Sequence, residues 1–242
     1  MKIILTLLFT TFLNAQTINI AVASNVSYAI NELKKEFVKN HPYIKVQVTL
    51  ASSGKLTAQI KNGAPYGLFM SANMKYPEAL YKDKIAISKP TVYAFGALSL
   101  FSIHKQDFSH GIEMLKSKNI KRIAVANPKT APYGIATFEA LNNAKIYEDI
   151  KSKFVYGESI SQTVTYAVVA TDIGIIAKSS LYSSKMSKYK EGTNWVSVNQ
   201  KLYTPIKQGI VLLKNSDAYK AFYDFILSEK ARKIFKKYGY IL

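Results

Sequence analysis

Hydrophobic and polar positions along this chain form blocks that predict strands alternating with helices. Residues 18–23 are apolar or small, as in a buried strand, and Val26, Ile30, Leu33 and Phe37 then follow at helical spacing. Further strands are expected at residues 44–50, 66–70, 91–103, 121–127, 153–157, 172–178 and 208–214. Further helices are expected around residues 56–60 and at 76–83, 134–143, 161–170, 218–227 and 229–238. This order predicts an α/β fold in which helices cover both faces of a mostly parallel sheet.

The alternation is interrupted by residues 183–204, which are polar and rich in lysine and contain the only tryptophan, Trp195. No helical pattern is visible in this segment. We expect the chain to form two lobes, the first made of residues 16–88 and 205–242 and the second of residues 89–204.

The first fifteen residues, "MKIILTLLFTTFLNA", have the pattern of an export signal peptide. A lysine precedes an apolar run that is shorter than the roughly 20 residues needed to span a membrane. The chain contains no cysteine, so neither a disulfide nor a cysteine-linked lipid is available. We therefore expect a soluble, monomeric protein in the periplasm.

The formal net charge of +18 raises the question of nucleic-acid binding. The lysines are spread along the whole chain, however, and the only arginines are Arg122 and Arg232. This distribution indicates a solvated basic surface, and we expect no nucleic-acid partner. A positive field of this size attracts small anions.

Small neutral residues stand at four predicted junctions between a strand and a helix. The junctions are Ser24, "TLASSGKL" (49–56), "AVANPKTAPYGIATF" (124–138) and "VYGESISQTV" (155–164). The first N–H groups of a helix have no partner inside the helix and carry partial positive charge, so they bind anions without any lysine. In open α/β sheets such helix starts lie beyond the carboxyl ends of the strands, where ligands bind. One interpretation is that each serine only caps its helix; the four junctions together favour an anion site that includes Ser24.

Several of these segments resemble the molybdate-binding proteins that serve ABC importers. The resemblance is carried by "AVASNVSYAINELKKEF", "LASSGKLTAQIKNGAPYGLFMSAN", "ANPKTAPYGIATFEAL", "DIGIIAKSS" and "AFYDFILSEKARKIFKKYGY". It implies a type II periplasmic-binding-protein fold, with two doubly wound α/β lobes and a central cleft. It also implies that molybdate or tungstate binds in the cleft, without a cofactor or a directly bound metal, and is delivered to the importer's membrane permease.

The resemblance also implies which residues hold the oxyanion. Ser24 and Ser53 are expected to donate hydroxyl and backbone hydrogen bonds, and Tyr133 and Ile160 to donate backbone N–H groups. Ala177 occupies the position where the family usually has a tyrosine ligand, so one hydroxyl donor is missing there. The sequence leaves open whether the bulky Tyr133 replaces it.

Other functions remain as alternatives. A secreted hydrolase is the main one from a different class, but the three histidines have no metal-ligand spacing and no G-x-S-x-G elbow is present. Another tetrahedral oxyanion, such as sulfate, is the main alternative among binding proteins. Phosphate is less favoured because only Glu158 lies near an expected contact to accept a phosphate proton.

Overall fold

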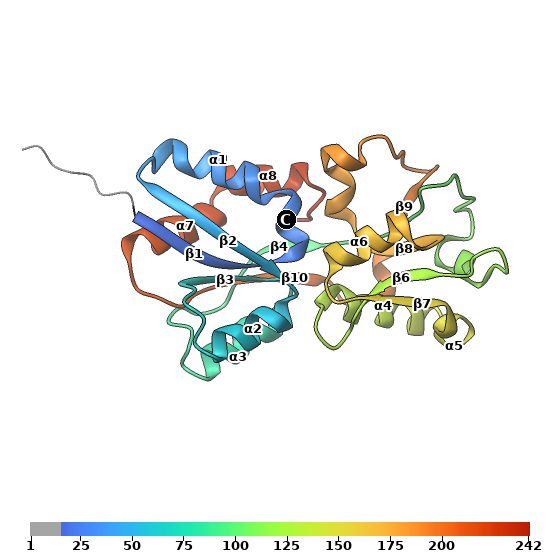
Figure 1. Ribbon diagram of the computed structural model, residues 1–242, viewed down its shortest axis with the longest axis horizontal. Coiled ribbons are helices and arrows are strands. Elements are labelled where there is room, and N and C mark those ends of the chain that lie inside the picture. Colours follow the sequence, from blue (N-terminus) through green and yellow to red (C-terminus); the bar gives the residue numbers. More distant parts are fainter. Residues whose placement is uncertain (1–15) are drawn as a thin grey trace, which may run out of the picture.

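Two five-stranded sheets, each with helices on both faces, stand side by side in the computed structural model (Figure 1). The structure describes residues 16–242, and the predicted signal peptide lies outside them. We call the units built on these sheets the first and second lobes. The predicted α/β class and two-lobed type II fold are confirmed.

The first sheet has the strand order β2–β1–β3–β10–β4. Its strands are β1 (Gln16–Ala23), β2 (Ile44–Ala51), β3 (Leu68–Ser71), β4 (Thr91–Gly96) and β10 (Ile206–Leu212). Helices α1, α7 and α8 cover one face and α2 and α3 the other (Figure 1). Their bounds are α1 (Ile30–Asn40), α2 (Ser53–Lys61), α3 (Lys75–Lys82), α7 (Asp217–Leu227) and α8 (Glu229–Lys237).

The second sheet has the strand order β7–β6–β8–β5–β9. Its strands are β5 (Leu98–Phe101), β6 (Ile123–Ala126), β7 (Phe154–Gly157), β8 (Ile173–Ala177) and β9 (Trp195–Ser197). The α-helices of this lobe are α4 (Pro132–Asn143), α5 (Tyr147–Ile150) and α6 (Ile160–Val169). Its 3₁₀ turns are η2 (Gly111–Lys116), η3 (Lys151–Lys153), η4 (Lys178–Tyr182), η5 (Ser184–Met186) and η6 (Gln200–Leu202).

Both sheets are mixed, whereas the sequence predicted a mostly parallel arrangement. In each, a strand pairs in parallel with both neighbours: β1 with β2 and β3, and β6 with β7 and β8. The antiparallel strands are β10, against β3 and β4, and β5, against β8 and β9. β10 and β5 are the strands by which the chain enters each sheet from the other lobe, so they run opposite to strands formed by local strand–helix–strand connections.

The crossing between lobes falls at a different residue from the one expected. The apolar run 91–103 was predicted as one strand, but it forms β4 in the first sheet and β5 in the second, with Ala97 between them. The chain therefore leaves the first sheet at Ala97 and not near residue 88. Strands buried on both faces give a continuous apolar run, so the pattern does not record a change of sheet.

The segment after β1 also differs from its predicted form. The helix expected from Asn25 begins as a 3₁₀ turn, η1 (Ser24–Tyr28), and becomes α-helical only in α1. Ile30, Leu33 and Phe37 of α1 are buried against the first sheet, as their spacing predicted. The tight turn places Ser24 and Asn25 directly at the end of β1.

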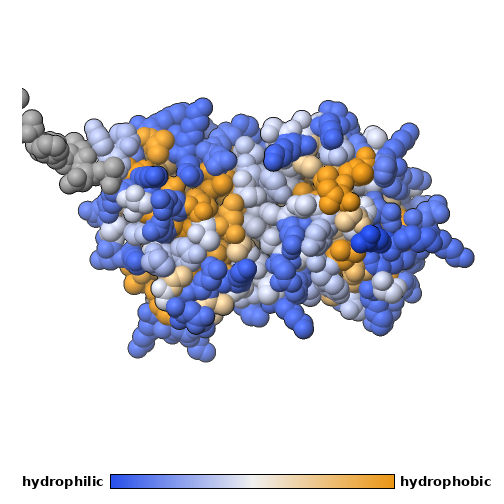
Figure 2. Space-filling model, in the orientation of Figure 1, coloured by the Kyte–Doolittle hydropathy of each residue, from blue (hydrophilic) through white to orange (hydrophobic). Residues whose placement is uncertain are grey.

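The surface agrees with a chain that is basic and solvated. In Figure 2 hydrophilic residues are spread over both lobes, and no continuous hydrophobic band joins the described residues of one lobe to those of the other on this face. Within residues 16–242, none of the helices combines the length and the apolar character that a membrane span requires.

Candidate anion-binding site

A small pocket lies where the two lobes meet, and both lobes contribute to its lining. The first lobe supplies Ala23, Ser24, Asn25, Ser52, Ser53 and Ala72, and the second supplies Ala131, Pro132, Tyr133 and Ile160. The free volume of the pocket is about 10 Å³. Pockets for drug-sized ligands are typically about 300–1,000 Å³, so this one suits a small ligand.

Three serines of the first lobe line the pocket. Ser24 is the first residue of η1, Ser52 is the N-cap of α2, and Ser53 is the first residue of α2. The Ser53 Oγ accepts a hydrogen bond of 2.9 Å from the backbone N–H of Ala72. Because this bond uses the oxygen as an acceptor, the Ser53 hydroxyl proton stays free to donate to a ligand.

The second lobe brings two helix starts to the pocket. Tyr133 follows Pro132 in the first turn of α4, and Ile160 is the first residue of α6. N–H groups at these positions have no partner inside their own helices. The side chains of Tyr133 and Ile160 are 1% and 3% exposed and belong to the second lobe's core. Their backbone N–H groups, at the starts of the two helices, remain available as donors.

Direct hydrogen bonds between the lobes close the rim of the pocket. The N–H of Gly54, in the first turn of α2, donates to the carbonyl oxygen of Thr130 in the second lobe at 2.9 Å. The Ser161 hydroxyl of α6 donates to the carbonyl oxygen of Ser24 at 2.8 Å. Gly54 has no room for a side chain, because a Cβ there would lie 2.9 Å from the Thr130 oxygen. The structure is thus a closed arrangement of the two lobes.

The described residues that line the pocket are all uncharged. The acid considered in the sequence, Glu158, is outside this lining and accepts a hydrogen bond from the Asn127 side chain. Burial raises the pKa of the Tyr133 hydroxyl well above its ordinary value, so the phenol stays neutral. Within residues 16–242, no three histidine, cysteine, aspartate or glutamate side chains are grouped as a metal site would require.

Comparisons with known proteins agree with this architecture. The family model described as "Bacterial extracellular solute-binding protein" matches residues 18–241. The molybdate-binding protein ModA of Azotobacter vinelandii is 34% identical over 232 residues, which cover 93% of this chain and 90% of that protein. ModA of Rhodobacter capsulatus is also 34% identical, over 91% of this chain and 86% of that protein.

The chain belongs to the ModA family of bacterial extracellular solute-binding proteins. The solved periplasmic molybdate-binding protein of Azotobacter vinelandii has the same fold as this ModA-family chain. The two superimpose with a TM-score of 0.85 at 27% identity, covering 93% of this chain and 99% of the other. The match therefore includes both lobes and the junction between them.

The pocket of this ModA-family chain brings together all four residues expected as ligand contacts, Ser24, Ser53, Tyr133 and Ile160. Ala177 is not part of the lining; it is the last residue of β8 and is fully buried in the second lobe's core.

Two polar residues of the pocket, Asn25 and Ser52, were missed in the sequence. Asn25 is fully buried in η1, between Ser24 and Val26. A polar amide directly after Ser24 was the signal available for it. Ser52 was visible in "TLASSGKL", but the strand-to-helix pattern alone does not tell which of two adjacent serines faces a ligand.

Proposed function

We propose that this protein captures molybdate, or the similar anion tungstate, in the periplasm and presents it to the membrane permease of an ABC importer. The observation that carries the proposal is a small pocket lined by uncharged residues at four helix starts from two lobes. The 34% identity to proteins named for molybdate binding supports the choice of anion.

The donors at the pocket suit an anion that accepts hydrogen bonds in several directions. The first lobe contributes the hydroxyls of Ser24 and Ser53, and the second contributes the N–H groups of Tyr133 and Ile160. Each hydrogen bond to a charged group is worth about 1.5–3 kcal/mol. A tetrahedral dianion accepts such bonds at all four oxygens, so donors converging from both lobes match its shape.

The lack of charge among the pocket-lining residues also bears on selectivity. A protonated phosphate requires an acceptor for its proton, usually a carboxylate, whereas a fully ionised dianion requires donors only. Sulfate is ionised like molybdate, so the separation from sulfate depends on the spacing of the donors. A hydrolase would need an acid, base or nucleophile in the pocket, and no histidine or carboxylate of the described chain lines it.

Closure of the lobes provides the signal for delivery. The two crossings, at Ala97 and between η6 and β10, allow the lobes to rotate about a common hinge. The Gly54–Thr130 and Ser161–Ser24 bonds form only when the lobes meet. We infer that the protein acts as a monomer whose closed form is recognised by the permease.

Calorimetric titration of the purified protein with molybdate, tungstate, sulfate and phosphate in turn tests this function. We expect saturable binding of one molybdate or tungstate ion per molecule, much weaker binding of sulfate, and the weakest binding of phosphate. Preference for sulfate would establish the alternative oxyanion, and no saturable binding of any of the four anions would refute the proposal.

A further inference from the structure

Two buried polar atoms beside the pocket have no hydrogen-bond partner in the described chain, and they come from opposite lobes. They are the Oδ1 of Asn25, in η1, and the hydroxyl of Tyr133, in α4. Asn25 is completely buried, and Tyr133 is 1% exposed. Both residues line the pocket. A buried polar group without a partner is costly, so two such groups at one place call for an explanation.

The Asn25 side chain is held in a fixed orientation that leaves only its oxygen unused. Its Nδ2 donates to the Gln208 Oε1 and to the Tyr240 hydroxyl, each at 2.8 Å. Its backbone oxygen accepts from the hydroxyls of Tyr240 and Ser179, at 3.0 and 3.1 Å. The atom that remains, Oδ1, is an acceptor only.

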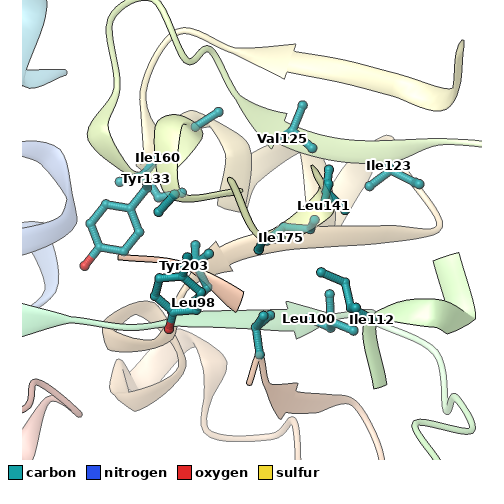
Figure 3. Close-up of a cluster of buried hydrophobic side chains, with 14 of the residues drawn as sticks. Leu98, Leu100, Ile112, Ile123, Val125, Tyr133, Leu141, Ile160, Ile175 and Tyr203 are labelled. Atoms are coloured by element: carbon teal, nitrogen blue, oxygen red, sulfur yellow. The ribbon is translucent and has the colours of Figure 1, made fainter. Parts of the chain in front are cut away.

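The Tyr133 side chain extends from the second lobe into the first. In Figure 3 its ring points away from the other labelled side chains of the second lobe's core. Its hydroxyl lies against Gly96, the last residue of β4, where a Cβ would overlap the phenol oxygen. The same Cβ position is 2.9 Å from the Gln208 Nε2, so the phenol reaches the side chains that hold Asn25.

The chemistry of these two atoms is complementary. The Tyr133 hydroxyl keeps its proton, because burial raises its pKa, and it is therefore a donor. The Asn25 Oδ1 is an acceptor without a partner, because the amide nitrogen makes both of the side chain's hydrogen bonds. These two atoms belong to different lobes and move apart when the lobes open. A link between the two atoms therefore stabilises only the closed form.

We propose that one ordered water joins these two groups when the lobes are closed, accepting a hydrogen bond from the Tyr133 hydroxyl and donating one to the Asn25 Oδ1. Tyr133 is then a positioning residue: through Asn25 it fixes the Ser24–Asn25 segment against the bound anion. Gly96 provides the slot that the phenol requires. This inference rests on the proposed function, because closure is measured through anion binding.

The test compares three proteins by molybdate titration and by thermal unfolding without ligand. Tyr133→Phe is expected to weaken molybdate binding about 3- to 10-fold, the range for one hydrogen bond, and to leave the ligand-free unfolding midpoint unchanged or higher. Thr137→Val is the matched control: its hydroxyl is also buried without a partner in the described chain, but Thr137 lies in α4 outside the lining of the pocket. We expect it to bind molybdate like the unmodified protein.

A double-mutant cycle separates positioning from a purely structural role. In an Asn25→Ala background, Tyr133→Phe is expected to have no further effect on affinity, because the acceptor is gone. Gly96→Ala gives a second, independent route, and it should weaken binding by displacing the phenol. Equal affinity of Tyr133→Phe and the unmodified protein, or additive losses in the cycle, would overturn this inference alone. Absence of anion binding by the unmodified protein would overturn the proposed function and this inference with it.

Discussion

The two lobes share one sheet plan but present different chemistry to the pocket between them. In each sheet one strand is parallel to both neighbours, and an antiparallel strand enters from the other lobe. The first lobe brings the serine side chains Ser24, Ser52 and Ser53. The second brings the helix starts at Tyr133 and Ile160; the Ile160 side chain is buried in that lobe's core, and the Tyr133 ring extends toward the first lobe.

This difference separates two ways of building an anion site. A hydroxyl donor is lost when the side chain is changed, whereas a backbone N–H donor is kept as long as the helix start keeps its position. The three serines of the first lobe should therefore be sensitive to side-chain substitution, whereas Ile160 in the second lobe should tolerate it and Tyr133 should respond only through its hydroxyl. Substitutions matched between the lobes test this contrast.

The largest effect is expected from Ser24→Ala combined with Ser53→Ala. The double change removes two hydroxyl donors to a charged ligand, so molybdate affinity should fall by roughly 10²- to 10⁴-fold in calorimetric titration. Ser99→Ala is the control: Ser99 is a buried serine of the second sheet whose hydroxyl has no partner in the described chain. Full affinity in the double variant would show that the first lobe does not act through these hydroxyls.

Gly54→Ala should have the next largest effect, because it obstructs the contact between lobes. The added methyl group would lie 2.9 Å from the Thr130 oxygen in the second lobe and 2.8 Å from the Tyr76 hydroxyl at the end of a side chain in the first. Overpacking against the Thr130 backbone should weaken closure and lower affinity by roughly tenfold or more. Stability of the ligand-free protein should change little. Gly63→Ala is expected to lower the stability of the ligand-free protein and to leave molybdate affinity unchanged. Gly63 has a φ of +83°, which strains an alanine, but there is open space around it. Should Gly54→Ala bind molybdate normally, the lobes do not close through this contact.

A smaller effect is expected from Ile160→Val in the second lobe. The substitution keeps the backbone N–H, so molybdate affinity should stay within about twofold. Removal of one buried methyl group should lower the free energy of unfolding by about 0.5–1.5 kcal/mol. Ile123→Val, in the same core but away from the pocket, provides the stability reference in urea unfolding. A large loss of affinity in Ile160→Val alone would contradict the backbone role of the second lobe.

The smallest effect concerns a pH-dependent contact on the outer side of the first lobe. The Lys237 ammonium holds the pKa of Glu32 below its ordinary value of 4.5, and the pair links α1 to α8. A lowered folded-state pKa stabilises the protein above pH 4.5, and this contribution is lost as the pH falls further. Glu32→Gln should slightly lower the urea midpoint at neutral pH, and the difference should shrink in acid. If the difference in urea midpoint between Glu32→Gln and the unmodified protein grows in acid, the pKa of Glu32 is not lowered in the folded protein.

Most of the fold could be predicted from the sequence because strands and helices differ in hydrophobic period. The helices α1, α7 and α8 lie where apolar spacing predicted them, to within a few residues. The division of residues 91–103 into β4 and β5 could not be predicted, because both strands are apolar and the change of sheet depends on tertiary pairing. The short strand β9 was missed for a similar reason, as only Trp195 marks it in a polar segment.

The junctions around the pocket could be predicted because helix starts leave a recognisable local pattern, and the resemblance to the molybdate-binding family then selected one residue at each junction. Ser24, Ser53, Tyr133 and Ile160 all belong to such starts. The direction of the Tyr133 phenol could not be predicted, because it depends on the space left by Gly96 in a distant strand. The contact of these four helix-start residues with the anion remains a prediction.

The central claim is that uncharged donors from both lobes hold a doubly negative oxyanion, and proton exchange during binding tests it most directly. Molybdate is titrated into the protein at neutral pH in two buffers that differ in their heat of ionisation. With no charged side chain lining the pocket, we predict saturable binding of one ion per molecule and the same heat in both buffers. A buffer-dependent heat equivalent to one proton, or no saturable binding of molybdate, would contradict the account.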